Sequence, residues 1–250
     1  MATAEAIAAF ASDAGASGAE RTANLVEAQN KAASMFVDIE RDLVRSGVTE
    51  KDLTDAIYKL GQEKYNVRTH WHKRVVRSGP HTLSPFKENL PDRTIGEDDI
   101  LFVDLGPVFE EYEADFGRTF VLGSDPDKLA LRDALEPLWF AIKQRFDESP
   151  NMTCAEMYKE TLELTAEAAR KNGRQWTYGN DLFCGHLVGN FPHERIPNDK
   201  VSLYLTTGNP EPVRSLDNNG QQRHWILEIY LYDEAGGFGG FFEQIMTVDY

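Results

Sequence analysis

The sequence predicts an α+β fold in which two pairs of helices are each followed by β-strands. Apolar residues recur every three to four positions between residues 24 and 60 and again between residues 126 and 173, which is the periodicity of amphipathic helices. Short runs of β-branched and aromatic residues follow each helical region, which is typical of strands. No sequence repeat is visible, but the repeated order indicates two similar halves.

Most of the predicted connections are short, which favours a single compact domain. We expect this domain to cover residues 22–250. Residues 1–21 are rich in Ala, Gly and Ser and show little periodicity, so we expect a flexible N-terminal arm or at most a short weak helix. The hydrophobic content of 41% and the charged content of 27% are ordinary for a soluble globular protein.

The first helix pair is predicted near the N-terminus. The apolar pattern that starts at Asn24 continues to Leu43, and Gly47 provides a C-terminal stop. Thr49 is a suitable N-cap for the second helix, which turns Leu53 and its periodic partners inward. These signals are local, so they predict the helices without reference to the rest of the chain.

The second helix pair is predicted by proline and by a capping box. Pro126 suits the first turn of a long helix, and Pro137 inside the same pattern predicts a kink. Thr153 and Glu156 have the spacing of a capping box for the next helix, which Gly173 would end.

Strands are predicted where short apolar runs lie between turn residues. The predicted strands cover residues 100–103, 118–122, 201–205, 225–232 and 241–248. The glycine-rich stretch 236–240 lies between the last two, so we expect it to form a hairpin turn.

The overall charge limits the classes of partner. A net charge of −15 argues against binding to the phosphate backbone of nucleic acids and against docking on anionic membranes. The two cysteines, Cys154 and Cys184, are too few for a disulfide scaffold. The first residues lack the basic region of a secretory signal, and no apolar run is long enough to span a bilayer. We therefore expect a cytoplasmic protein.

Five residues in separate segments carry the chemistry: Asp104, Asp115, His186, Glu228 and Glu243. Four carboxylates and one imidazole cannot share a buried pocket at neutral pH unless their charge is compensated, because like charges repel and desolvation penalises each one. Divalent cations would provide that compensation. The alternative is that the two aspartates are turn formers and that His186 is an ordinary loop histidine between glycines.

The order and context of these motifs resemble those of the pita-bread metallopeptidases, which include methionine aminopeptidase, aminopeptidase P and prolidase. The shared features are two aspartates eleven residues apart, Asp-Leu-Gly and Arg-Thr-Phe beside them, Gly-His-x-x-Gly, a second His followed by Glu, and two late glutamates. The similarity extends from about residue 22 to the C-terminus. It implies a pita-bread fold with two pseudo-symmetric halves, a curved antiparallel sheet and a metal site between the halves.

The resemblance also implies roles for the five residues. Asp104 would chelate one metal ion, while Asp115 and Glu243 would bridge both ions. His186 and Glu228 would complete the second position, and Glu228 would help to activate a bridging water. The cofactor would be two divalent ions about 3.5–4 Å apart. Ligands that are mostly oxygen favour manganese, cobalt or iron, and zinc is also compatible.

Further candidate residues are histidines and one aromatic residue. The resemblance implies that His193 contacts the substrate or carries a proton. His81 lies close to the place where relatives carry another histidine, so it is a candidate for catalysis or substrate binding. Phe238 in its glycine-rich loop is a candidate for the substrate pocket. His70 and His72 share one face of a strand as metal ligands could, but we favour a role at the surface or in the substrate pocket.

The sequence departs from the family pattern at three positions near the site. Gly117 replaces a threonine common in the prolidase branch, Ile229 replaces a proline, and Phe241 replaces an arginine. The separate N-terminal domain of prolidases has no counterpart in the sequence. The loss of the arginine weakens the expectation of strict Xaa-Pro specificity.

The leading prediction is a metal-dependent, aminopeptidase-like hydrolase that cleaves a peptide or amide bond with a metal-activated water. The partner would be a peptide or small amide substrate, with no nucleic acid and no membrane, and aromatic residues and family habit suggest a homodimer. One alternative is a pita-bread enzyme that acts on a small molecule, either as an amide hydrolase or as a metal-dependent oxygenase. A non-catalytic binding module is the other.

Overall fold

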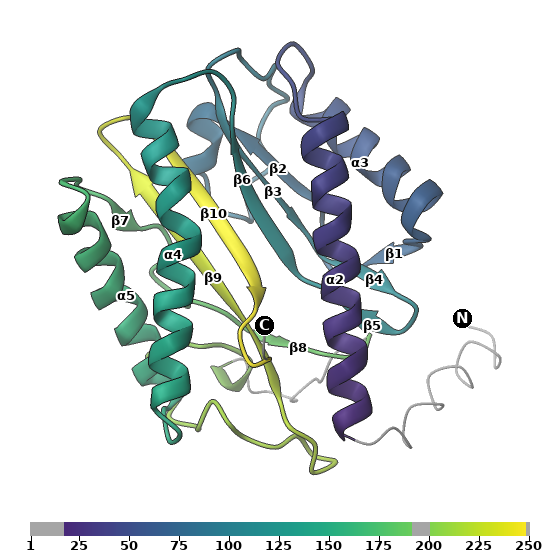
Figure 1. Ribbon diagram of the computed structural model, residues 1–250, viewed down its shortest axis with the longest axis vertical. Coiled ribbons are helices and arrows are strands. Elements are labelled where there is room, and N and C mark those ends of the chain that lie inside the picture. Colours follow the sequence, from purple (N-terminus) through teal and green to yellow (C-terminus); the bar gives the residue numbers. More distant parts are fainter. Residues whose placement is uncertain (1–17, 192–200, 249–250) are drawn as a thin grey trace.

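A seven-stranded sheet forms the centre of the molecule (Figure 1). The computed structural model describes residues 18–191 and 201–248. The strands follow the order β2-β3-β6-β10-β9-β7, β8 pairs with β9 beside this path, and every pair is antiparallel. Their bounds are Val75–Ser78 (β2), Ile100–Leu105 (β3), Phe116–Val121 (β6), Phe238–Ile245 (β10), His224–Asp233 (β9), Thr177–Tyr178 (β7) and Leu187–Val188 (β8).

A second, small sheet has the order β1-β4-β5. Its strands are Thr69–His70 (β1), Pro107–Phe109 (β4) and Tyr112–Glu113 (β5). Because β4 and β5 lie between β3 and β6 in the chain, this sheet extends the hairpin that carries both predicted aspartates.

Four helices complete the predicted arrangement of two halves, α2 (Gly18–Asp42), α3 (Glu50–Tyr65), α4 (Pro126–Glu148) and α5 (Cys154–Lys171). Figure 1 shows α2 and α4 lying across the same face of the sheet. One hydrophobic core lies between α4, α5 and strand residues such as Leu227 and Ile229. The other lies between α2, α3 and strand residues such as Leu101 and Val103. The predicted α+β class is therefore confirmed.

Local signals placed the starts of α3, α4 and α5 correctly. Thr49 and Thr153 each cap a helix through a complete capping box. Asp125 caps α4, and Pro126 occupies its first turn. Gly173 follows α5 with a φ of 64°, a conformation that favours glycine. Pro137 lies inside α4, and the kink expected there stays a prediction.

Two expectations about strands were wrong. Residues 201–205 do not form a strand: Val201–Leu203 is a short 3₁₀ helix (η2), and Tyr204 makes an isolated bridge to His186. The segment pairs only briefly, because its backbone meets a loop instead of a strand edge. The hairpin turn covers residues 234–237, and β10 already begins at Phe238. Gly240 therefore lies within β10. A Cβ at this position would lie 2.6 Å from Leu131 of α4, so close packing against the helix explains the glycine.

The first helix also begins earlier than expected. α2 starts at Gly18, so residues 18–21 of the predicted arm are helical. The rest of that arm, residues 1–17, lies outside the described residues. Among the residues that the structure describes, no helix combines the length and the hydropathy needed to cross a membrane.

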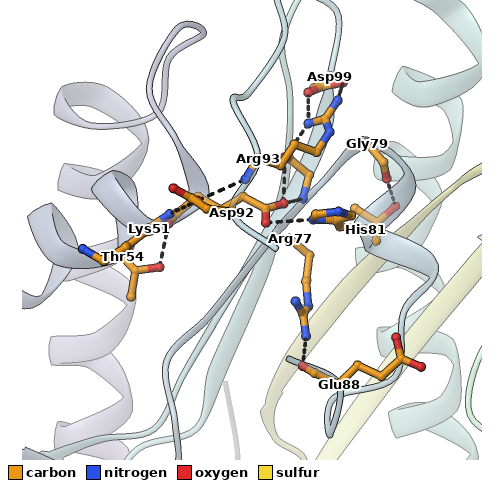
Figure 2. A network of polar contacts seen from close by, with 12 residues as sticks. Lys51, Thr54, Arg77, Gly79, His81, Glu88, Asp92, Arg93 and Asp99 are labelled. Atoms are coloured by element: carbon orange, nitrogen blue, oxygen red, sulfur yellow. Dashed lines mark hydrogen bonds and ion pairs between the residues drawn. The ribbon is translucent and has the colours of Figure 1, made fainter. Parts of the chain in front are cut away.

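A buried polar network ties α3 to β2 and to the 3₁₀ helix η1 (Gly79–Leu83). The carboxylate of Glu50, which is 7% exposed, accepts hydrogen bonds from the backbone N–H (2.6 Å) and hydroxyl (2.9 Å) of Ser78. It also lies 2.9 Å from Nδ1 of His81. Arg93 joins the Ser78 hydroxyl to Asp99, and Figure 2 shows Arg93, Asp99 and His81 in this network. The network fixes β2 next to β3, the strand that carries Asp104.

We predict that Glu50→Ala lowers the free energy of unfolding by about 2–4 kcal/mol, because buried donors lose a charged acceptor. Urea denaturation followed by circular dichroism measures the loss. Lys51→Ala is the matched control, since its ion pair with Asp55 is exposed, and it should change stability little. An equal loss in both variants would show that the network is not a main source of stability.

Candidate metal centre

The register of the sheet aligns three of the predicted acids in one row. Asp104 of β3 lies opposite Gly117 of β6, and Gly117 lies opposite Glu243 of β10. Glu243 in turn lies opposite Glu228 of β9. Side chains alternate along a strand, so these acids share the face that points away from the helices. The pairing of β6 with β10 joins the two halves of the chain, and the acids lie at that junction.

Asp115 and His186 complete the predicted set. Asp115 directly precedes β6, and His186 directly precedes β8. Nε2 of His186 lies 3.0 Å from Oδ2 of Asp115, 3.5 Å from Oε1 of Glu228 and 4.0 Å from Oε1 of Glu243. The exposed fraction of the five side chains is between 2% and 13%. The structure thus brings all five together in a nearly buried cluster.

A sixth residue of the cluster is His72, for which the sequence favoured a role at the surface or in the substrate pocket. Nε2 of His72 lies 3.1 Å from Oδ1 of Asp115 and 3.5 Å from Oδ1 of Asp104. Its neighbour in the motif, His70, lies elsewhere with its ring 6.3 Å from that of Tyr58. The His-x-His spacing was the available signal, and it did not say which of the two histidines would face the acids.

Burial sets the protonation of the acids in the metal-free protein. Desolvation raises the pKa of Asp104 and that of Glu228 to about 7, and it holds the pKa of Glu243 well above its usual range. These acids therefore retain protons under conditions in which an exposed carboxyl is charged.

Asp115 differs because it lies between two imidazoles. Burial opposes its charge, but His72 and His186 outweigh that effect and lower its pKa to about 2. Burial likewise disfavours the charged imidazolium, yet the facing carboxylates raise the pKa of each histidine to about 9. The cluster thus keeps Asp115 charged by means of protonated neighbours.

Divalent cations fit the residues of this cluster. Oε2 of Glu243 is buried and has no hydrogen-bond partner among the described residues, an arrangement that is costly unless a cation faces the oxygen. Two sets of donors lie within 4.8 Å of one another, and they share Asp115: His72, Asp104 and Asp115 form one, and Asp115, His186 and Glu243 form the other. Carboxylate and imidazole donors suit manganese, iron, cobalt or zinc.

The remaining predicted residues lie outside the acid cluster or outside the described residues. His81 belongs to the Glu50 network. Phe238 is buried in the core with α4, and it occupies the face of β10 opposite to Glu243, because the two are an odd number of residues apart. His193 lies outside the described residues.

Two of the departures from the family pattern, Gly117 and Phe241, are in contact with each other. A Cβ at position 117 would overlap the ring of Phe241, so the ring in this position requires a glycine at 117. The Phe241 ring contacts those of Tyr230 (4.5 Å between centroids) and Phe102 (5.4 Å). Interaction with Tyr230 lowers the pKa of Glu228, against the larger effect of burial. An aromatic row therefore lies beside the acid row on the same face.

Sequence comparison relates this chain to metal-dependent peptidases. A model of metallopeptidase family M24 matches residues 23–248. The chain is 26% identical over 166 residues to an Xaa-Pro dipeptidase from Lactobacillus delbrueckii subsp. lactis. The aligned part is 65% of this chain and 42% of that protein, so the chain spans less than half of its relative's length.

Solved structures show the same fold. The chain is similar to a prolidase from Thermococcus sibiricus, with a TM-score of 0.66 and 19% identity over 91% of this chain and 58% of that one. It is also similar to an X-Pro aminopeptidase from Thermotoga maritima MSB8, with a TM-score of 0.64 and 20% identity over 92% of this chain and 61% of that one. These similarities confirm the predicted pita-bread fold.

We predict that the metal-free protein becomes less stable as the pH rises from about 6 to 9. Asp104 and Glu228 have a folded pKa of about 7, above the unfolded value of about 4, so their contribution to stability falls as the pH rises from about 4 through 7 and changes little above about pH 8. His72 and His186 have a folded pKa of about 9. Their contribution is complete below about pH 6.5 and is lost as the pH rises through 9.

The acids and the histidines therefore both make the metal-free protein less stable as the pH rises. The pKa of Asp115 is lowered to about 2, so its contribution to stability changes only below about pH 4. Thermal unfolding at pH 6 and pH 9, in a chelator and in Mn²⁺, measures the effect. Metal binding should reverse the trend, since deprotonated ligands bind cations more tightly. A chelated protein that is more stable at pH 9 would contradict the prediction.

We predict that Gly117→Ala costs about 1–3 kcal/mol of stability, because the added methyl group overlaps the Phe241 ring. The cost should shrink in a Phe241→Ala background, and a double-mutant cycle by urea denaturation measures the coupling. Gly18→Ala is the control, since its methyl group would meet nothing within 4 Å. Additive effects at positions 117 and 241 would show that the two positions are independent.

Proposed function

Because the chain belongs to metallopeptidase family M24, we propose that it is a metal-dependent peptidase of the Xaa-Pro branch. It would cleave a peptide bond near a free amino end. The observation that carries the proposal is the buried cluster at the junction of the two halves, with four carboxylates, His186 and an unpartnered oxygen on Glu243. The similarity to an Xaa-Pro dipeptidase supports the choice of branch.

The five predicted residues would hold two cations, with Asp115 and Glu243 between them. When bound, such a pair lowers the pKa of a water molecule and polarises the carbonyl of the scissile bond. The carboxylate of Glu228 would accept the proton of the attacking water. His193 would contact the substrate or carry a proton to the leaving group.

The aromatic row gives the proposed site an apolar side. Phe102 and Phe241 are buried, and Tyr230 is half-buried, on the same face as the acids. A proline ring or another apolar group would bury surface against this side, which favours neutral substrates. Phe241 also removes the positive charge that the family pattern has at this position, so we propose a broader specificity than strict Xaa-Pro cleavage.

The proposal extends to the metal and the cellular setting. We propose manganese, cobalt or iron as the native cation, with zinc compatible, and a homodimer acting in the cytoplasm. The net charge of −15 supports the absence of nucleic-acid partners. The comparisons do not favour the alternatives of a small-molecule amide hydrolase, an oxygenase or a non-catalytic binding module.

We predict that Mn²⁺- or Co²⁺-loaded protein cleaves Xaa-Pro dipeptides and tripeptides faster than matched Xaa-Ala peptides. Asp115→Asn should lower kcat/KM by about 100-fold or more, because it removes a shared ligand. Asp125→Asn is the matched control: Asp125 caps α4, and asparagine caps a helix equally well. Liquid chromatography of the products measures turnover. No cleavage of any peptide at full metal occupancy would defeat the proposal.

A further inference from the structure

His72 occupies a place in the cluster that matches that of His186. The carboxylate of Asp115 has one imidazole next to each oxygen: Nε2 of His72 lies 3.1 Å from Oδ1, and Nε2 of His186 lies 3.0 Å from Oδ2. Each ring is also 3.5 Å from a second carboxylate, Asp104 for His72 and Glu228 for His186. The resemblance to known peptidases implies one histidine ligand, whereas the structure presents two equivalent imidazoles.

The two rings are held by the same hydrogen bond. Nδ1 of His72 donates to the carbonyl of Lys73 (2.7 Å), and Nδ1 of His186 donates to the carbonyl of Leu187 (2.8 Å). In both cases the acceptor is the next residue in the chain. This hydrogen bond holds each ring with Nε2 toward the carboxylates, so that a cation that displaces the Nε2 proton would meet the lone pair, which is how histidine ligands are usually oriented.

The distances around His72 fit shared coordination. Two donor atoms that each bind one cation at about 2.1 Å, at an angle of about 90–110°, lie about 3.0–3.4 Å apart. The separations of Nε2 from Asp115 and Asp104, 3.1 and 3.5 Å, are close to this range. His72, Asp104 and Asp115 can therefore present three donors to one ion.

Packing holds the His72 ring in this position. Its side chain is 10% exposed. The ring of Trp71 lies between the two imidazoles, 4.5 Å from His72 and 5.1 Å from His186. The segment approaches Gly106 so closely that a Cβ there would overlap both Trp71 and His72. Because Gly106 directly follows β3, this contact fixes His72 relative to Asp104.

We propose that His72 is a metal ligand, at the position formed by Asp104 and Asp115, so that each ion of the pair has one imidazole. The inference rests on the proposed metal-dependent function. A nitrogen donor at this position favours borderline ions such as iron, cobalt or zinc over harder ions, compared with an all-oxygen set. It also makes the two positions similar in donor type, so both should fill over a narrow range of metal concentration.

His72→Phe tests the proposal, because it keeps a ring against Trp71 and removes Nε2. We predict that calorimetric titration of the chelated full-length protein with Co²⁺ shows two tight sites in the native protein. In the variant, one site should weaken by about 10–100-fold while the other is retained. His70→Phe is the matched control, since His70 lies two residues away beside Tyr58, and it should bind both ions normally.

X-ray absorption at the cobalt edge supplies a readout that a structural role would not change. At a Co²⁺ concentration that fills both positions, the imidazole contribution per ion should fall by about half in His72→Phe, and His72→Gln should give the same result if the ring substitution perturbs folding. An unchanged imidazole contribution and two unchanged sites would overturn the proposal and make His72 an ion-pair partner of Asp115.

The same samples separate this inference from the proposed activity. Native protein that cleaves peptides, with an imidazole contribution that does not depend on His72, overturns the ligand role alone. Native protein that holds two Co²⁺ ions and loses imidazole scattering in His72→Phe supports the ligand role even if it cleaves no peptide. In that case only the proposed peptidase activity fails.

Discussion

The structure depends on how the charge of several neighbouring carboxylates is compensated on one buried face of the sheet. Asp104, Glu243 and Glu228 occupy one row across adjacent strands, and Asp115 approaches from the start of β6. Burying an uncompensated carboxylate costs on the order of several kcal/mol. The opposite face of the same strands supplies the stability, because residues such as Leu227 pack beneath the helices there. In these strands, the face that packs against the helices contributes stability, and the opposite face carries the acids.

Local signals made much of this fold predictable from sequence. The capping boxes at Thr49 and Thr153 depend on residues three positions apart, so they were read correctly. The five acid and imidazole residues were found because the motifs around them are distinctive. Residues 201–205 were misread because an apolar run becomes a strand only where a partner edge is available, and the partner is set by tertiary structure. The position of His72 could not be read from the sequence for a related reason, since it depends on contact with Gly106.

Departures from the family pattern also need the structure to be understood. In sequence, Gly117 and Phe241 are two separate losses, of a hydroxyl and of a positive charge. In space, the ring of one fills the volume left by the other, and Tyr230 extends the same surface to Glu228. The phenylalanine would be tolerated poorly without Gly117, because the ring needs a glycine beneath it. The two substitutions together therefore replace polar groups beside the acids with an aromatic surface.

The two halves of the chain explain why a second imidazole belongs in the cluster. The second half supplies His186 after its helix pair, followed by Glu228 and Glu243 on its strands. The first half supplies His72 after its own helix pair, followed by two aspartates on or beside its strands. Each half thus contributes one imidazole and two carboxylates in the same chain order. A pseudo-symmetric site of this kind offers two similar cation positions, and an all-oxygen position on one side would break that correspondence.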